Sequence, residues 1–120
     1  MPYVYLSLIH ISAELSKASG CDFEIHETEI PVQLNVRAAC ELFGLDPIHV
    51  ANEGCFLAVV AADDADRCLQ LLRTHKSGVH ACKIGQVMTV SRDGRVWVKG
   101  IFGQRRLLVL PSGEQLPRIC

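Results

Sequence analysis

The spacing of apolar residues along the chain predicts its helices and strands. From Val32, apolar residues recur at Val36, Cys40 and Phe43, which is the interval of one helix face, and Gly44 is a typical helix end. Cys40 on this face is interpreted as a small buried hydrophobe. By the same reasoning the sequence predicts helices at residues 12–19, 31–43 and 63–76, and strands at residues 3–11, 22–26, 55–61, 82–90, 95–99 and 106–110.

Individual residues mark where these elements begin or turn. Ser12 and Asp63 are the expected N-caps of their helices. The nearly unbroken apolar run at residues 55–61 is typical of a central, buried strand. Asp93-Gly94 predicts a hairpin between the strands on either side of it. Helices that alternate with strands, followed by a run of strands, predict an α+β, or mixed α/β, fold with the helices packed on one face of a sheet.

Composition and charge narrow the class of protein. The chain has 120 residues, of which 49% are hydrophobic and 21% charged, as expected for one globular domain with an ordinary core. The formal net charge of −1 gives no basic patch for nucleic acid. No apolar run approaches the ~18 residues that a membrane-spanning helix needs. Because the N-terminus carries no convincing export signal, we expect a cytoplasmic protein that binds neither nucleic acid nor membrane.

The cysteines are interpreted as free thiols rather than as disulfides or metal ligands. A cytoplasmic compartment keeps thiols reduced. No two of the six cysteines form the closely spaced pair that zinc sites use, and the five histidines are equally scattered. We therefore expect no metal site. No role beyond packing is assigned to five of the cysteines, which are Cys21, Cys40, Cys55, Cys68 and Cys82.

The last ten residues, 111–120, differ from the rest of the chain. They contain two prolines and a glycine and have no periodicity, which predicts an extended tail. Fully stretched, such a tail spans at most about 33–36 Å. It ends in Cys120, whose thiolate form is a nucleophile that the nearby Arg118 favours. A terminal thiol on a long tail can accept a chemical group at one active site and present it at another.

The tail also carries the most specific resemblance to a known family. The ending Pro117-Arg118-Ile119-Cys120 resembles the terminal tetrapeptide of the HypE proteins of hydrogenase maturation, and the resemblance extends over about residues 13–120. It implies a segment at residues 1–12 outside the family, a domain at residues 13–110 like the C-terminal domain of aminoimidazole ribonucleotide synthetase, and the tail at residues 111–120. Further segments similar to HypE in order and spacing are Ile30-Pro31-Val32, residues 36–47, and Val50-Ala51-Asn52-Glu53-Gly54.

The resemblance implies a reaction and its partners. In the HypE family a carbamoyltransferase, HypF, places a carbamoyl group on the terminal cysteine, and ATP-dependent dehydration converts the thiocarbamate into a thiocyanate. The cyanide then passes to iron held by the HypC–HypD complex, as a ligand for nickel–iron hydrogenase. ATP and magnesium bind in the N-terminal domain of the family, which has no counterpart here, so no cofactor is expected on this chain and we expect it to be inactive alone. The family also implies a homodimer, formed largely through that domain.

Four site residues follow from carrying the resemblance onto this sequence. Cys120 is the expected carrier nucleophile. Glu53 is the expected catalytic carboxylate, which removes protons from the amide nitrogen of the thiocarbamate, and Asn52 is expected to orient Glu53 or a phosphate. Arg118 is expected to position the tail. The alternative for Glu53 is a solvated turn residue without a catalytic role.

Two other functions stay open at this point. The first is a non-catalytic binding module that keeps only the surface its partners recognise. The second is a relative of the purine-synthesis or selenophosphate-synthesis enzymes, which share this domain type but have no need of a terminal thiol. Chemical modification of Cys120 separates the binding module from the carrier. In either case a chain without its neighbouring domain is expected to expose an apolar surface.

Overall fold

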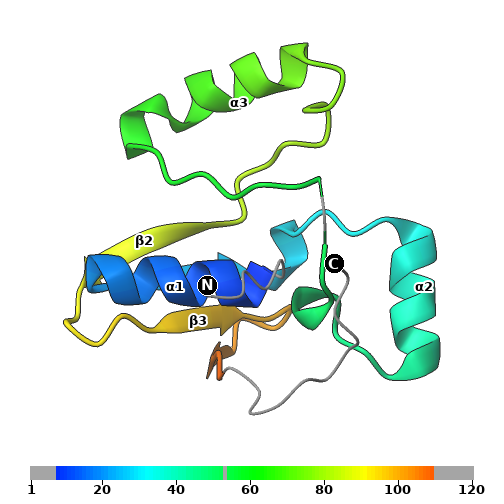
Figure 1. The fold of residues 1–120 in the computed structure, drawn as a ribbon, viewed down its shortest axis with the longest axis horizontal. Coiled ribbons are helices and arrows are strands. Elements are labelled where there is room, and N and C mark those ends of the chain that lie inside the picture. Colours follow the sequence, from blue (N-terminus) through cyan, green and yellow to red (C-terminus); the bar gives the residue numbers. More distant parts are fainter. Residues whose placement is uncertain (1–7, 53, 110–120) are drawn as a thin grey trace, which may run out of the picture.

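Figure 1 shows the computed structural model of the chain, which describes residues 8–52 and 54–109. One strand lies between the first two helices, and the other three strands follow the third helix. In chain order they are α1 (Leu8–Ser19), β1 (Cys21–His26), α2 (Leu34–Phe43), α3 (Ala65–Thr74), β2 (Gly85–Val90), β3 (Val96–Lys99) and β4 (Arg105–Leu107). Short 3-10 turns lie at Glu27–Glu29, Pro47–His49 and Ala62–Asp64.

The strands form one mixed sheet in the order β2-β1-β3-β4. β1 is antiparallel to β2 and parallel to β3, and β3 is antiparallel to β4. The hairpin predicted at Asp93-Gly94 is therefore wrong, because β1 lies between the two strands that this turn connects. The turn sits beside the start of β1, where the Gly20 carbonyl accepts hydrogen bonds from the N–H groups of Ser91 and Arg92. The predicted α+β class is confirmed, with the strand order as the correction.

The core lies between α1 and one face of the sheet (Figure 1). The fully buried residues of α1 are Ile9, Ser12 and Ser16, which recur at helical spacing along one side of the helix. Because side chains alternate along a strand, every second residue of β1 and β3 faces α1 and the others lie on the opposite face. The buried apolar side chains of these two strands are Phe23, Ile25, Val96 and Val98.

The N-terminal part of the structure corrects two predictions. The strand predicted at residues 3–11 is wrong for residues 8–11, which form the first turn of α1, while residues 1–7 lie outside the described residues. Ser12 is not an N-cap, because it lies inside α1 and its hydroxyl donates a 2.6 Å hydrogen bond to the Leu8 carbonyl. A short apolar run fits either period, and here the small Ser12 and Ser16 let a helix approach the sheet. The predicted domain limits stay a prediction. α1 runs without a break across the limit predicted between residues 12 and 13.

α1 is also joined directly to the turn between β2 and β3. The Ser16 hydroxyl donates a 3.0 Å hydrogen bond to the Gly94 carbonyl. Gly94 is buried and has a φ of 59°, and a Cβ at this position would collide with the backbone carbonyl of Ser16. Only glycine therefore fits both the backbone angle and the space at this contact.

α2 begins later than predicted and ends where predicted. Gly44 follows its last residue with a φ of 65°, a left-handed angle that suits glycine at a helix end. Cys40 is buried, as predicted. The other apolar positions of the predicted face are not buried, and both Val36 and Phe43 are exposed. The sequence pattern thus identifies an apolar face that the described part of the chain does not cover.

Residues 54–84 carry α3 away from the sheet, and we call them the α3 arm (Figure 1). The central strand predicted at residues 55–61 is wrong: this segment forms no strand, and Val59, near its middle, is 55% exposed. An apolar run becomes a buried strand only where a neighbouring strand and a covering layer exist. Among the described residues this segment has neither, because the order of the sheet leaves it out.

The start of α3 corrects one further prediction. Asp63 lies in the preceding 3-10 turn, and Asp64 occupies the N-cap without a side-chain hydrogen bond, so the cap predicted at Asp63 is wrong. The main contact of α3 is with this turn, whereas α1 packs on β1 and β3. The predicted apolar stripe is the less exposed side of α3, although none of its members is fully buried; they are Ala65, Cys68, Leu69 and Leu72.

Two polar contacts fix the end of the α3 arm. Arg73 Nε donates a 2.9 Å hydrogen bond to the Ala81 carbonyl, and Cys82 Sγ lies 3.2 Å from the Glu29 carbonyl oxygen. Burial raises the pKa of the Cys82 thiol. A thiol that stays protonated can donate this hydrogen bond.

Candidate functional site

Asn52 is the predicted site residue that the structure describes. Glu53, Arg118 and Cys120 lie outside the described residues. The side chain of Asn52 is exposed. Its amide nitrogen Nδ2 donates a hydrogen bond to Cys55 Sγ, and the two atoms are 3.5 Å apart. This contact joins Asn52 to a residue three positions later and leaves Asn52 at the surface; we name this pair of residues the Asn52 turn.

The segment before Asn52 fixes the position of this turn. Asp46 caps the 3-10 turn Pro47–His49, and its carboxylate accepts a 3.0 Å hydrogen bond from the Ile48 N–H. Ile48 is buried together with Ile9 and Val98. Asn52 therefore follows, four residues later, a side chain held in the core.

The same part of the core receives the chain that leads into the tail. Arg106 of β4 lies 3.4 Å from the carboxylate of Asp46 and 3.7 Å from that of Glu27. Leu108 packs against the cluster that contains Ile48, and its N–H donates a 2.8 Å hydrogen bond to the Val96 carbonyl. The fold thus brings the Asn52 turn and the base of the tail to one region, although Arg106 and Asp46 are 60 residues apart in sequence.

The tail is long enough for the proposed chemistry at this turn. Cys120 is the twelfth residue after Leu108, and this stretch spans up to about 40 Å when extended. The segment before Asn52 and the segment around Leu108 both contact the Ile48 cluster, so the distance between them is much shorter than the stretched tail. Contact between Cys120 and the Asn52 turn is therefore compatible with the path of the described chain.

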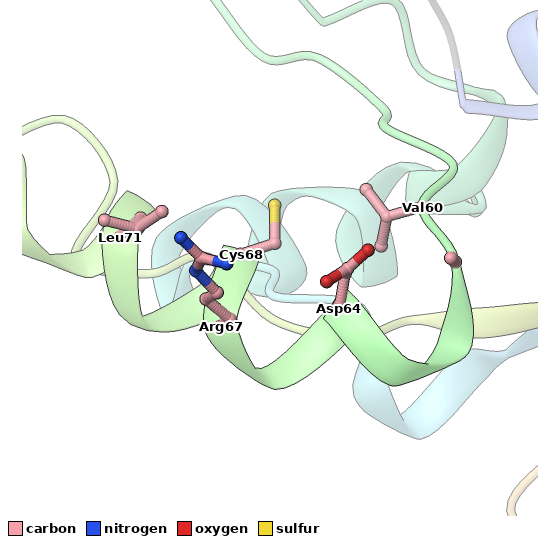
Figure 2. Close-up of a pocket in the computed structure, with 6 residues that line it drawn as sticks. Val60, Asp64, Arg67, Cys68 and Leu71 are labelled. Atoms are coloured by element: carbon pink, nitrogen blue, oxygen red, sulfur yellow. The ribbon is translucent and has the colours of Figure 1, made fainter.

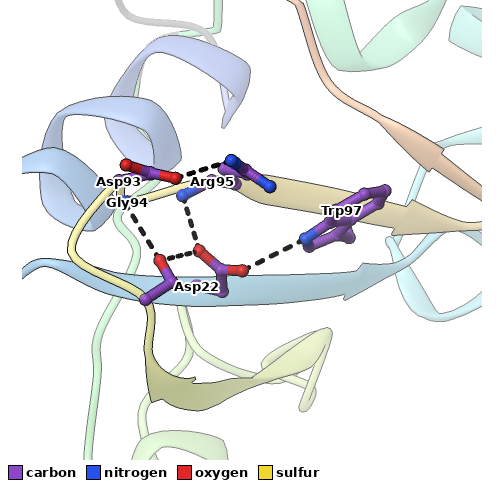
Figure 3. A network of polar contacts seen from close by, with 6 residues as sticks. Asp22, Asp93, Gly94, Arg95 and Trp97 are labelled. Atoms are coloured by element: carbon purple, nitrogen blue, oxygen red, sulfur yellow. Dashed lines mark hydrogen bonds and ion pairs between the residues drawn. The ribbon is translucent and has the colours of Figure 1, made fainter.

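Asp22 is the centre of a hydrogen-bond network at one end of the sheet (Figure 3). Its carboxylate accepts hydrogen bonds from the Ser91 hydroxyl, from the Arg95 N–H at 2.9 Å and from the Trp97 indole N–H at 3.3 Å. The Ser91 hydroxyl, followed by the Arg95 N–H, holds the pKa of Asp22 below its ordinary value. Both carboxylate oxygens are occupied, so Asp22 fixes the turn and the indole and is a poor candidate for a catalytic base.

A second charged group lies on the face of the sheet opposite α1. Glu24 is buried, and its two oxygens lie 3.0 Å from His26 Nε2 and 3.0 Å from Arg105 Nε. The guanidinium of Arg105 lies 5.1 Å from the centre of the Trp97 ring. The hydrogen bond from His26, and then the charge of Arg105, hold the pKa of Glu24 below its ordinary value. These paired charges connect β1 to β4 across β3.

A pocket lies on the α3 arm, away from these groups (Figure 2). It is formed by α3, its N-terminal turn and the segment before that turn, and its lining residues are Val60, Ala61, Asp64, Arg67, Cys68 and Leu71. Figure 2 shows Asp64, Arg67 and Cys68 side by side along the helix. Asn52 is not among the lining residues, so this pocket and the Asn52 turn are separate features.

Metal ions in proteins are held by several His, Cys, Asp or Glu side chains that converge on one point. Within residues 8–52 and 54–109, no three or more His, Cys, Asp or Glu side chains lie together in a way that could hold a metal ion. No helix in the same ranges is long and apolar enough to cross a membrane.

Comparison with known proteins first defines the class. Residues 8–98 match the family model of the AIR synthase related protein, C-terminal domain, and the chain belongs to that family. The match covers α1, the α3 arm and the sheet through most of β3. This agrees with the resemblance to aminoimidazole ribonucleotide synthetase predicted for the domain.

Relatives within this class point to one kind of protein. The chain is 49% identical over 109 residues to the carbamoyl dehydratase HypE of Cupriavidus necator, a match that covers 89% of this chain and 30% of that protein. The corresponding HypE of Escherichia coli is 43% identical over 107 residues. The predicted resemblance to the C-terminal domain of HypE is confirmed, for a chain that spans about three tenths of the length of these relatives.

Solved structures agree with the sequence relatives. A crystal structure of the hydrogenase maturation protein HypE matches with a TM-score of 0.87 and 35% identity, over 98% of this chain and 38% of that one. HypE in complex with ATP matches with a TM-score of 0.85 at 35% identity, over 96% and 35% of the two chains. A HypE–HypF complex matches with a TM-score of 0.81 at 34% identity, over 89% and 34%.

Proposed function

We propose that the chain is the carrier part of a HypE-type carbamoyl dehydratase, with Cys120 as the residue that holds the carbamoyl group. The main support is the 49% identity to the carbamoyl dehydratase HypE of Cupriavidus necator over 109 residues, in a chain whose last residue is a cysteine. Since the chain spans 30% of that relative, the proposed function is that of a part: it carries the group and does not dehydrate it alone.

In the proposed loading step the Cys120 thiolate attacks the carbamoyl carbon. A sulfur–carbon bond forms while the bond from that carbon to its leaving group breaks. Arg118, two residues before Cys120, favours the thiolate and positions the tail. In the following dehydration the amide oxygen leaves with a phosphate supplied by ATP, the nitrogen loses both protons, and a thiocyanate remains on sulfur.

The Asn52 turn is the proposed place where these protons leave. Glu53 is the proposed proton acceptor, and Asn52 orients it or a phosphate. The hydrogen bond from Asn52 to Cys55 supports this role, since it limits the positions that the Asn52 amide adopts. The contact between Arg106 and Asp46 supports it as well, because it holds the base of the tail near this turn.

The proposed partners are those of a HypE-type protein. They are a HypF-type carbamoyltransferase, a HypC–HypD complex that receives the cyanide, and a second HypE-type chain in a homodimer. The HypE–HypF complex and the HypE structure with ATP support the first partner and the use of ATP by such proteins. ATP and magnesium are expected to bind in the portion of these proteins that this chain does not match. The proposed location is the cytoplasm.

The test is the loading of Cys120. The purified chain is mixed with a HypF-type carbamoyltransferase, carbamoyl phosphate and ATP, and its intact mass and the peptide that contains Cys120 are measured. We expect one added carbamoyl group on Cys120. Cys120→Ser should remove the modification, whereas Cys68→Ser, a change at a half-buried cysteine of α3, should leave loading in place.

The control for this experiment is a full-length HypE in the same mixture. If that protein is loaded and this chain is not, the carrier proposal is wrong, and a non-catalytic binding module becomes the better hypothesis. Loading at another cysteine, with Cys120 unmodified, would contradict the assignment of the carrier residue.

A further inference from the structure

The turn between β3 and β4 presents two large apolar side chains to solvent. Residues 100–104 form this turn, which we call the β3–β4 tip. Within it Ile101 is 72% exposed and Phe102 is 92% exposed, which is the highest value among the large apolar residues that the structure describes. A single exposed apolar residue needs no explanation, but two adjacent ones at the end of a hairpin form a contact surface that projects from the sheet.

The backbone of the tip is fixed by its own hydrogen bonds. The Gly100 N–H donates to the Gln104 carbonyl at 2.8 Å, and the Gly103 N–H donates to the Gly100 carbonyl at 3.0 Å. The Gln104 side chain also accepts a 3.0 Å hydrogen bond from the Phe102 N–H. A fixed turn loses little conformational freedom when a partner binds, and aromatic side chains held in this way are typical binding hot spots.

Basic residues border the tip. Lys99 and Arg105 are paired in register on β3 and β4 at its base, and Arg106 follows. Glu24 and Glu27 pair with the two arginines, while Lys99 is exposed. A complementary partner surface therefore has an apolar pocket for Phe102 with an acidic group opposite Lys99.

The position of the tip relative to the tail points to one partner. Phe102 lies seven residues before Val109, the last described residue, so the two are at most about 25 Å apart. An interface of ordinary size covers about 800 Å² on each partner, a patch about 30 Å across. An enzyme whose footprint has the tip at one edge therefore also covers the start of the tail, and the eleven residues from there to Cys120 span up to about 40 Å.

We propose that the β3–β4 tip, through Ile101 and Phe102, is the docking surface for the carbamoyltransferase that loads Cys120. This inference rests on the proposed carrier function and adds to it the surface that the transferase binds. The tip supplies affinity and leaves the tail free to enter the active site of the transferase. Docking and chemistry are thus carried by different residues of this chain.

The test uses the full chain and a HypF-type carbamoyltransferase. The initial rate of Cys120 loading is measured against the concentration of the chain, and direct binding is measured by calorimetry without carbamoyl phosphate. We expect Phe102→Asp to raise KM and the dissociation constant at least about tenfold, because it removes a buried aromatic contact of the complex. The limiting rate should change much less, since Cys120 and the tail are intact.

The matched control is Phe43→Asp on α2, which makes the same change at a phenylalanine that is 73% exposed. It should leave both constants within about twofold. Because Phe102 is almost fully exposed, its replacement should leave the midpoint of thermal unfolding nearly unchanged. The milder Phe102→Ser, with a thermal unfolding curve for each variant, keeps the test valid if the aspartate variant misfolds.

The outcomes separate this inference from the proposed function. If the unaltered chain is loaded and Phe102→Asp has normal KM and binding, the docking surface is wrong and the carrier function stands. Equal weakening by Phe43→Asp and Phe102→Asp also overturns the tip as the docking surface. If the unaltered chain binds the transferase through the tip but is never modified, the carrier function is wrong and the docking surface stands.

Discussion

The sheet with α1 and the α3 arm use similar residues in opposite ways. Val96 on β3 is 3% exposed, whereas Val59 in the apolar run of the arm is 55% exposed. Both belong to segments that the sequence predicts as strands. The difference is that Val96 has β1 and β4 on either side and α1 above it, while residues 55–61 pair with no strand among those described. Apolar character alone therefore does not bury a segment; it requires a neighbour that covers it.

This difference implies unequal stability within one chain. The sheet and α1 share many buried contacts and should unfold together, whereas α2 and the α3 arm have few buried side chains and should open at a lower free energy. Matched substitutions in the two regions make this comparison quantitative.

The largest effect is expected from removing a core side chain. Ile9→Ala deletes a fully buried side chain that packs against Ile48 and Val98, and it should lower the free energy of unfolding by about 3–5 kcal/mol. The same change at the exposed Ile101 should cost less than about 0.5 kcal/mol. Urea denaturation of both variants measures the difference. Equal losses would mean that the core does not lie between α1 and the sheet.

A glycine in each region gives the next comparison. Gly94→Ala puts a residue with a Cβ at a positive φ, and that Cβ collides with the Ser16 carbonyl. The change should lower the free energy of unfolding by about 2–4 kcal/mol. Gly44→Ala at the end of α2 has a similar φ but open space around it, so it should cost only about 1 kcal/mol. Thermal unfolding of the two variants distinguishes them. A cost at Gly44 as large as that at Gly94 would contradict the contact between α1 and the β2–β3 turn.

The smallest effect is expected from pH. The folded chain lowers the pKa of Asp22, so this carboxylate stabilises the fold above its unfolded pKa of about 4. That contribution is lost as the pH falls through the folded pKa, so stability should decrease in acid. Asp22→Asn should be less stable than the unaltered chain at pH 7 and should lose less stability on acidification. Asp93→Asn, at an exposed ion pair with Arg95 in the same turn, should behave like the unaltered chain at both pH values.

Predictions from the sequence succeed where a few adjacent residues decide the outcome. Gly44 ends α2 because a left-handed backbone angle is a local requirement, and Cys40 is buried because it is the position of the helix face nearest the core. The hairpin at Asp93-Gly94 fails because a turn motif reports that the chain reverses, not which strand it will meet. β1 enters between the two strands from more than 60 residues earlier, and no local pattern records that.

The same limit applies to the candidate site. The sequence identifies Asn52 through its resemblance to HypE, and the structure places its side chain at the surface, in contact with Cys55. The ion pair between Arg106 and Asp46, which holds the base of the tail near that turn, joins residues far apart in the sequence. Each residue alone looks like an ordinary surface charge, and only the fold reveals the contact.

The hydrogen bond between Trp97 and Asp22 has a practical consequence. Trp97 is the only tryptophan of the chain, so the indole fluorescence of the protein originates from β3. Its emission should respond to the loss of the Asp22 carboxylate and to opening of the sheet, and it should be insensitive to fraying of the α3 arm. Fluorescence and circular dichroism recorded on one sample would therefore follow the two regions separately, without any label.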